Sequence, residues 1–281
     1  MERNITQAEL LEQYKRFNYC LYHSGNNTLY KNCEQSRHKP PFLSERIDFV
    51  SDLPIVEGYT HPISVLKEDN RIYGYEMPLF DRSKSIFDLL MLPEKVFNST
   101  ISFKDKKEIL LSLHKTLKRL NKDYIVGDIN LHNILITKDG QGVFVDWENG
   151  RPINSTFGVY AAYFINQNDM LQDDALKLFI ASISLIYGID FESLVIDNSF
   201  YSLLGFPFQK TVLEYIDSVI DASASKDTIT IYFDEFLKHL KEPSNLERKR
   251  IKTEIDELGP NVYYIWKKID KNKHFCYTTC E

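Results

Sequence analysis

The chain has 281 residues, 43% hydrophobic and 26% charged, which is an ordinary globular composition. Its formal net charge of -6 gives no reason to expect nucleic acid or an anionic membrane as a partner. No apolar run approaches the roughly 18 residues of a membrane span, and the polar N-terminus lacks the apolar stretch of a secretion signal. We therefore expect a cytoplasmic protein with no membrane and no nucleic acid partner.

The first 80 residues have strand-like patterns interrupted by one helix. Residues 1–17 carry a thin apolar stripe that predicts a polar helix, and residues 17–33 predict a β-hairpin around a glycine turn. Apolar residues recur at helical spacing over 42–53. A second hairpin, which turns on an Asp-Asn pair, is expected over 63–77. These patterns indicate a small β-rich region.

Helical patterns dominate after residue 80. Ser85 and Ser102 are each followed three residues later by Asp, which predicts a capping box at the start of a short and a longer helix. A strand pair closes around Lys138-Asp139-Gly140, a hairpin signal. The predicted fold class is therefore α+β. Further helices are expected over 173–187, 210–222 and 230–241, and the predicted units are an N-terminal lobe (1–80), a C-terminal helical lobe (81–241) and a helical extension (242–281).

The most informative segment is 126–150, V-G-D-I-N-L-H-N-I-L-I-T-K-D-G-Q-G-V-F-V-D-W-E-N-G. Asp128 is followed five positions later by Asn133, then by the predicted hairpin, and eighteen positions later by Asp146. This series resembles the catalytic loop and metal-binding motif of the protein-kinase-like superfamily. The resemblance covers about residues 17–241 and implies a two-lobed protein-kinase-like fold with a small β-rich N-lobe and a larger α-helical C-lobe.

The resemblance gives each polar residue of this series a role. Asp128 would orient an acceptor hydroxyl and accept its proton, a task that requires little base strength in phosphoryl transfer. Asn133 and Asp146 would supply oxygen ligands to the Mg²⁺ that accompanies ATP. The alternative is that Asp128 and Asn133 only cap a turn.

The resemblance also implies a lysine that contacts the ATP phosphates and a glutamate on the next helix that holds it. Lys31 and Glu45 occur in that order, although their separation of fourteen positions is tighter than usual. Lys39, beside two prolines, is the lesser rival. The alternative is an exposed strand lysine and a solvated helix glutamate.

Two further positions resemble family features. Met77 resembles the gatekeeper at the end of the small lobe, with Pro78, Leu79 and Phe80 as the hinge that contacts adenine; the alternative is an ordinary apolar linker. Asp174, with Gly188 fourteen positions later, resembles the buried aspartate that braces the catalytic loop. The alternative is that Asp173 or Asp174 only N-caps this helix.

Departures from the family pattern are also informative. Val126 and Gly127 replace His-Arg, so we expect no readout of a phosphorylated activation loop. Asn130 stands where protein kinases carry lysine, which implies a lower rate or another cation at the site. The Gly-Asp and Asp-Trp-Glu sequences resemble aminoglycoside- and choline-kinase-like enzymes, and no glycine-rich phosphate loop precedes Lys31.

Three functional hypotheses follow. The first is a divergent Ser/Thr protein kinase that uses ATP and Mg²⁺ to phosphorylate a protein substrate. The second is a small-molecule kinase with a hydroxyl acceptor, although the segment between Asp146 and Asp174 is short for a substrate cage. The third is a pseudokinase scaffold, against which the retained Asp128, Asn133 and Asp146 argue. The expected function is an ATP- and Mg²⁺-dependent phosphotransferase.

Overall fold

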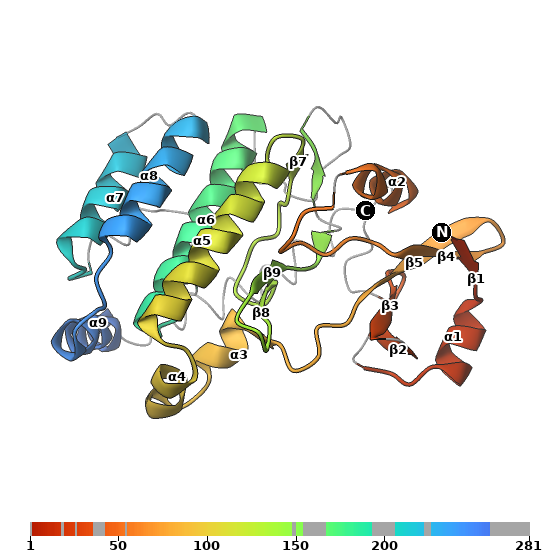
Figure 1. Ribbon diagram of the computed structural model, residues 1–281, viewed down its shortest axis with the longest axis horizontal. Helices are drawn as coiled ribbons and strands as arrows, with labels where there is room; N and C mark the ends of the chain where they lie inside the picture. Colours follow the sequence, from red (N-terminus) through yellow and green to blue (C-terminus); the bar gives the residue numbers. More distant parts are fainter. Residues whose placement is uncertain are drawn as a thin grey trace.

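The computed structural model describes residues 2–17, 20–25, 27–35, 43–53, 55–147, 150–153, 167–192, 206–221 and 226–258. The fold class is α+β, as predicted. A mixed five-stranded sheet with two helices occupies the N-terminal part, and a mainly helical part follows (Figure 1). Within the described residues, no helix is both long enough and apolar enough to cross a membrane.

The sheet confirms both predicted hairpins. Its strands lie in the order β1-β4-β5-β3-β2, with β1 parallel to β4 and the other neighbours antiparallel. The N-terminal elements are β1 (Glu2–Asn4), α1 (Gln7–Gln13), β2 (Leu21–Gly25), β3 (Thr28–Asn32), α2 (Leu43–Asp52), β4 (Ser64–Glu68) and β5 (Arg71–Pro78).

The single helix expected over 1–17 is wrong. Residues 2–4 form an edge strand on β4, and Glu2 forms an ion pair with Lys67 of that strand. The helix starts only after Thr6, whose hydroxyl accepts the Glu9 N–H at 3.1 Å in a capping box. Pairing with a distant strand therefore overrides the local pattern.

The two faces of the sheet have different partners, because side chains alternate along each strand. On the outer face, Leu10 of α1 packs in one cluster with Tyr22, Tyr30, Leu66 and Tyr73. On the inner face, Leu29, Tyr75 and Met77 join the main core with Ile47 and Val50 of α2. Lys31, two positions after Leu29, has the phase of the inner face.

The helical part places α5, α6, α7 and α8 side by side (Figure 1). Its helices are α3 (Ile86–Leu90), α4 (Glu94–Thr100), α5 (Phe103–Leu120), α6 (Gln167–Tyr187), α7 (Lys210–Asp221), α8 (Lys226–His239) and α9 (Asn245–Leu258). Its strands are β6 (Lys84–Ser85), β7 (Tyr124–Ile125), β8 (Ile134–Ile136), β9 (Gly142–Phe144) and β10 (Arg151–Pro152). Both predicted capping boxes are present, with the Asp88 and Asp105 N–H groups donating to the serine hydroxyls at 3.0 and 3.2 Å.

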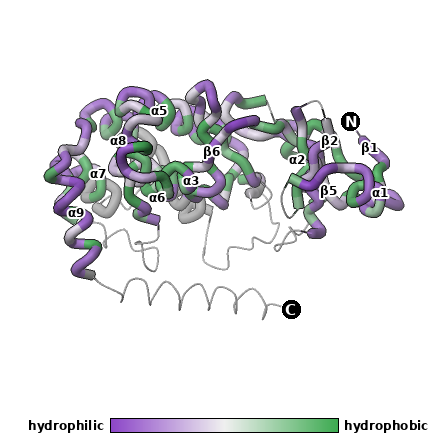
Figure 2. Tube along the Cα trace, turned by 90° about the horizontal axis from the view of Figure 1, so that it is seen from below, coloured by the Kyte–Doolittle hydropathy of each residue, from purple (hydrophilic) through white to green (hydrophobic). Residues whose placement is uncertain are grey.

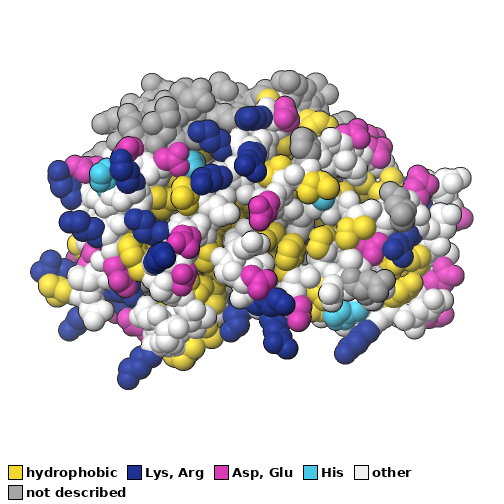
Figure 3. Space-filling model, viewed as in Figure 1, with side chains coloured by type: hydrophobic (Ala, Val, Ile, Leu, Met, Phe, Trp, Pro, Cys, Tyr) yellow, Lys and Arg dark blue, Asp and Glu magenta, His cyan; other side chains and the backbone are white. Residues whose placement is uncertain are grey.

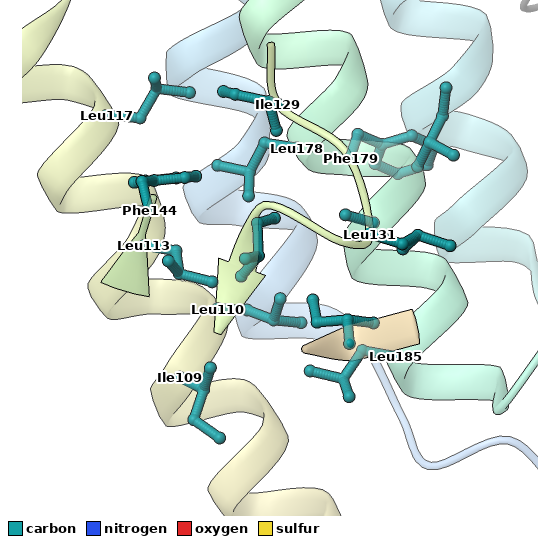
Figure 4. Close-up of a cluster of buried hydrophobic side chains, with 14 of the residues drawn as sticks. Ile109, Leu110, Leu113, Leu117, Ile129, Leu131, Phe144, Leu178, Phe179 and Leu185 are labelled. Carbon is teal, nitrogen blue, oxygen red and sulfur yellow. The ribbon is translucent and has the colours of Figure 1, made fainter. Parts of the chain in front are cut away.

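The main core forms between α5 and α6. Ile109, Leu113 and Leu117 of α5 are buried, and Leu178, Phe179 and Leu185 of α6 lie in the same cluster (Figure 4). Ile129 and Leu131 of the loop after β7 insert their side chains into this cluster. Hydrophobic and hydrophilic residues alternate along α5 in Figure 2, as expected for a helix with one buried face.

Other predicted boundaries were less accurate. Helix α6 begins at Gln167, earlier than the predicted 173, and α4 was not predicted. In the extension, Ile251 of α9 is fully buried in the main core, so the described part packs against the helical part. The rest of the predicted 242–281 extension, after residue 258, lies outside the described residues. On the face in Figure 3, Lys and Arg side chains are interspersed with Asp and Glu over the helical part.

Residues 57–60, after α2, connect the sheet part to the helical part through hydrogen bonds. Tyr59 forms a parallel bridge with Phe144 of β9, and the Phe144 N–H donates to the Gly58 carbonyl at 2.9 Å. The Thr116 hydroxyl of α5 donates to the Glu57 carbonyl at 2.8 Å. This segment fixes the sheet relative to the strand that precedes Asp146.

We expect Gly58→Ala to destabilise the protein more than Gly140→Ala. Both glycines have positive φ, +86° and +76°, which costs an alanine about 1 kcal/mol or more. Only at Gly58 would the new Cβ meet an atom, the Thr116 Oγ1 at 2.7 Å, while nothing lies within 4 Å at Gly140. The added clash is expected to cost about 1–3 kcal/mol, measured by urea unfolding. Equal losses would mean that the segment is not tightly packed.

Candidate functional site

A buried carboxylate from α6 holds the loop between β7 and β8. Asp174 of α6 is fully buried, and its two oxygens accept the Val126 and Gly127 N–H groups, each at 2.8 Å. The predicted bracing of this loop is confirmed. The helix-capping alternative is wrong, because Asp174 lies inside α6, two turns after its start at Gln167.

Asp128 follows these two braced residues, and two amides hold its carboxylate. The Asn130 Nδ2 donates to Asp128 Oδ1 at 3.0 Å, and the Asn133 Nδ2 donates to Asp128 Oδ2 at 3.1 Å. Asn130 also caps the turn, since its Oδ1 accepts the Asn133 N–H at 3.0 Å. Asn133 uses its amide nitrogen for Asp128, which leaves the amide oxygen on the other side as a potential ligand.

Asp146 lies two positions after the end of β9 and joins this loop to the sheet. Its φ of +63° is uncommon for a residue other than glycine, and such conformations concentrate at functional sites. The Val145 N–H donates to the Asn133 carbonyl at 3.0 Å, which fixes Asp146 beside the loop. Lys31 of β3, only 5% exposed, forms an ion pair with Asp146 Oδ1 across 115 positions of sequence.

The structure does not bring Glu45 to Lys31, which corrects the expected pair. Glu45 is exposed on α2, and within the described residues no hydrogen bond or ion pair joins it to Lys31. The phase of α2 explains this difference, because Arg46, Ile47 and Val50 are the residues that it buries. Lys39 lies outside the described residues.

Met77 and the segment after it lie at the end of β5. Met77 is buried on the inner face and pairs with Leu29 across the sheet. The Leu79 N–H donates to the Asn27 carbonyl at 2.8 Å, which extends the ladder beyond Pro78. Leu79 and Phe80 are half-buried. The segment is therefore an ordered extension of the sheet on the side of Lys31.

Glu192, just after α6, is a site residue that the sequence analysis missed. Its Oε2 accepts the Leu131 N–H at 2.9 Å, so a second carboxylate holds the loop. Burial raises its pKa to about 7, against the hydrogen bond from Leu131; Asp190 and Asp128 raise this pKa further, and Lys177 lowers it. No local motif marks Glu192, because only the packing of the chain places it beneath Leu131.

The site offers few side chains that could bind a cation, so phosphates or water would have to supply further ligands. Among the described residues, no group of three His, Cys, Asp or Glu side chains converges as a metal site. The Asp146 carboxylate and the Asn133 amide oxygen are hard oxygen donors. This set fits Mg²⁺, which proteins often bind with one or two side chains while phosphates and water supply the other ligands.

No protein-family model matches the chain, and no curated protein matches it either. The arrangement of Lys31, Asp146 and the loop that carries Asp128 is therefore the feature from which a function can be inferred.

We expect Asp174→Ala to lower the free energy of unfolding by about 3 kcal/mol or more, because it leaves the buried N–H groups of Val126 and Gly127 without an acceptor. Asp174→Asn retains one acceptor oxygen and should lose less. Urea unfolding of both variants measures the difference. A loss below about 1 kcal/mol for Asp174→Ala would contradict the bracing role.

The raised pKa of Glu192 predicts a pH-dependent stability. Between the ordinary value of 4.5 and the folded value of about 7, the folded protein binds more protons than the unfolded chain. The free energy of unfolding should therefore decrease as pH rises through this window. Glu192→Gln keeps an acceptor for Leu131 and should reduce that decrease in urea unfolding at several pH values. An unchanged pH dependence would show that Glu192 is not its source.

Proposed function

We propose that this protein is an ATP- and Mg²⁺-dependent phosphotransferase with a two-lobed protein-kinase-like fold. The sheet part would be the small lobe and the helical part the larger one. The observation that carries the proposal is the ion pair between Lys31 and Asp146, beside the loop that holds Asp128 and Asn133. Such an enzyme has to bind the ATP phosphates and their metal ion at one place. The sheet lysine and the carboxylate after the hairpin meet in a way that suits both tasks.

The residues divide the work by position. Lys31 would bind the phosphates of ATP with its buried ammonium group, exchanging part of its contact with Asp146 for phosphate oxygens. Asp146 and Asn133 would hold Mg²⁺, which when bound offsets the negative charge of the phosphates. Asp128, fixed by two amides, would orient the acceptor hydroxyl and accept its proton.

The segment after Met77 supports a nucleotide at the inner face of the sheet. The Leu79 N–H is used by Asn27, so the donor that faces adenine would be the Phe80 N–H. The carbonyl of Pro78 would be the acceptor. Both groups lie at the end of the strand that pairs with the strand of Lys31.

A protein hydroxyl is the acceptor that we favour, which makes the enzyme a divergent Ser/Thr protein kinase. The sequence between Asp146 and Asp174 is short for a cage around a small substrate. The Gly127-Asp128 and Asp146-Trp147 sequences favour the second candidate, a kinase for a small hydroxyl compound. A pseudokinase would need none of the hydrogen bonds that orient Asp128.

The test is transfer from [γ-³²P]ATP in Mg²⁺ to dephosphorylated casein, or to the protein itself, by the wild type and by Asp128→Asn. Asp128→Asn should lower transfer by about 100-fold or more while ATP binding is kept, because only the proton acceptor is lost. The matched control is Asp139→Asn in the exposed turn after β8, which should transfer as the wild type does.

Each other outcome has a clear meaning. ATP consumption that depends on Asp128 but labels no protein would favour the small-molecule acceptor. A wild type that binds ATP but neither transfers nor consumes it would favour the pseudokinase. Transfer that Asp128→Asn leaves unchanged would contradict the role of Asp128.

A further inference from the structure

We propose that Lys177 of α6 is a positioning residue that holds Asp128 in its reactive orientation and adds positive charge beneath the transfer site. This inference rests on the proposed phosphotransfer function. It assigns a role to a residue that no sequence motif marks.

The geometry places Lys177 next to the reactive loop. It lies three residues after Asp174 in α6 and therefore on nearly the same face of the helix. Its Nζ lies 3.4 Å from the Gly127 carbonyl oxygen, the peptide group that links Gly127 to Asp128. Asp174 binds the Gly127 N–H from the same helix. Both polar groups of the residue before Asp128 are thus bound by one face of α6.

The charges of the site explain why a cation is needed there. Asp128 and Asp190 both raise the pKa of Glu192, and Lys177 lowers this pKa. The three carboxylates therefore lie near one another, and Lys177 lies near them. The other cation of the described site, Lys31, forms its ion pair with Asp146 on the sheet side. Lys177 therefore supplies positive charge on the side of the Asp128 loop that lies against α6.

Position 130 provides an independent way to test this role. The Asn130 Nδ2 lies 3.0 Å from Asp128 Oδ1, so a side chain at position 130 reaches the carboxylate directly. Asn130 carries no charge, and a lysine there would bring an ammonium group to the carboxylate that Lys177 supports from beneath. A charge at one position should then compensate for its loss at the other.

The role is defined by the transfer step. The acceptor oxygen forms a bond to the γ-phosphorus, the bond between this phosphorus and the bridging oxygen of ADP breaks, and the hydroxyl proton moves to the Asp128 carboxylate. Lys177 takes no proton and forms no bond in this step. It keeps the backbone and the carboxylate of Asp128 in place and offsets the negative charge that surrounds them.

The experiment compares kcat and KM for [γ-³²P]ATP, with casein or water as acceptor, among four variants and the wild type. The variants are Lys177→Met, Lys177→Arg, Asn130→Lys and the double variant Lys177→Met with Asn130→Lys. Lys118→Met, at an exposed position of α5, is the matched control. Thermal unfolding shows whether each variant is folded at the assay temperature.

Lys177→Met should lower kcat about 10- to 100-fold and leave KM for ATP within about twofold, because Lys31 and Asp146 are unchanged. Lys177→Arg should recover at least about a third of the wild-type kcat. Asn130→Lys alone should lower kcat, because it removes the amide that holds Asp128 and caps the turn, but Lys177→Met should lower kcat less in the Asn130→Lys background than in the wild type. Unchanged kcat in Lys177→Met would overturn the proposal. So would a loss that Lys177→Arg does not restore and that is equally large in the Asn130→Lys background, because lost packing alone explains that result. A wild type without ATP turnover would instead refute the proposed function.

Discussion

The candidate site depends on one buried carboxylate, that of Asp174. Its two hydrogen bonds to consecutive backbone N–H groups force the loop after β7 to turn over the middle of α6. A buried carboxylate is costly unless its oxygens are satisfied, so this arrangement defines one conformation of the loop. Asp128 is the next residue after these two hydrogen-bonded residues. The two bonds therefore fix the backbone from which its side chain extends and so orient that side chain.

The second requirement is the phase of the sheet. Alternation along β3 sends Tyr30 to the outer cluster under α1 and Lys31 to the inner side with Leu29. A shift of one residue in the pairing of β3 with β5 would move Lys31 to the outer face. Met77, opposite Leu29, lies on the same side. The pairing of two strands thus brings the lysine to Asp146.

The sequence predicted those features that local signals or a resemblance encode. Ser85 and Ser102 begin helices because a side chain three residues later completes each cap, and the Asp-Asn turn of β4 and β5 has the positive φ values that this pair tolerates. The resemblance placed Asp174 beneath the loop. The predictions that failed concern elements that depend on contacts distant in sequence. An example is β1, which forms because β4 has a free edge.

Site residues divide in the same way. Asp128, Asn133 and Asp146 have a fixed spacing in one segment, so they could be found from the sequence. The predicted pairing of Glu45 with Lys31 is absent because α2 buries Arg46 and Ile47 instead. The sequence separation between Lys31 and Glu45 does not define this rotation of the helix. Glu192 and Lys177 could not be predicted, since only the packing of α6 beneath the loop brings them to Asp128.

The central claim is that Lys31 and Asp146 form a site for Mg²⁺ and ATP, and calorimetric titration with ATP tests it most directly. The wild type and Glu45→Ala should bind ATP with equal affinity and only weakly without Mg²⁺. Asp146→Asn should lose the effect of Mg²⁺, with affinity reduced at least about tenfold, an energy of about 1.4 kcal/mol. Binding that is independent of Mg²⁺ and unchanged in Asp146→Asn would contradict the account.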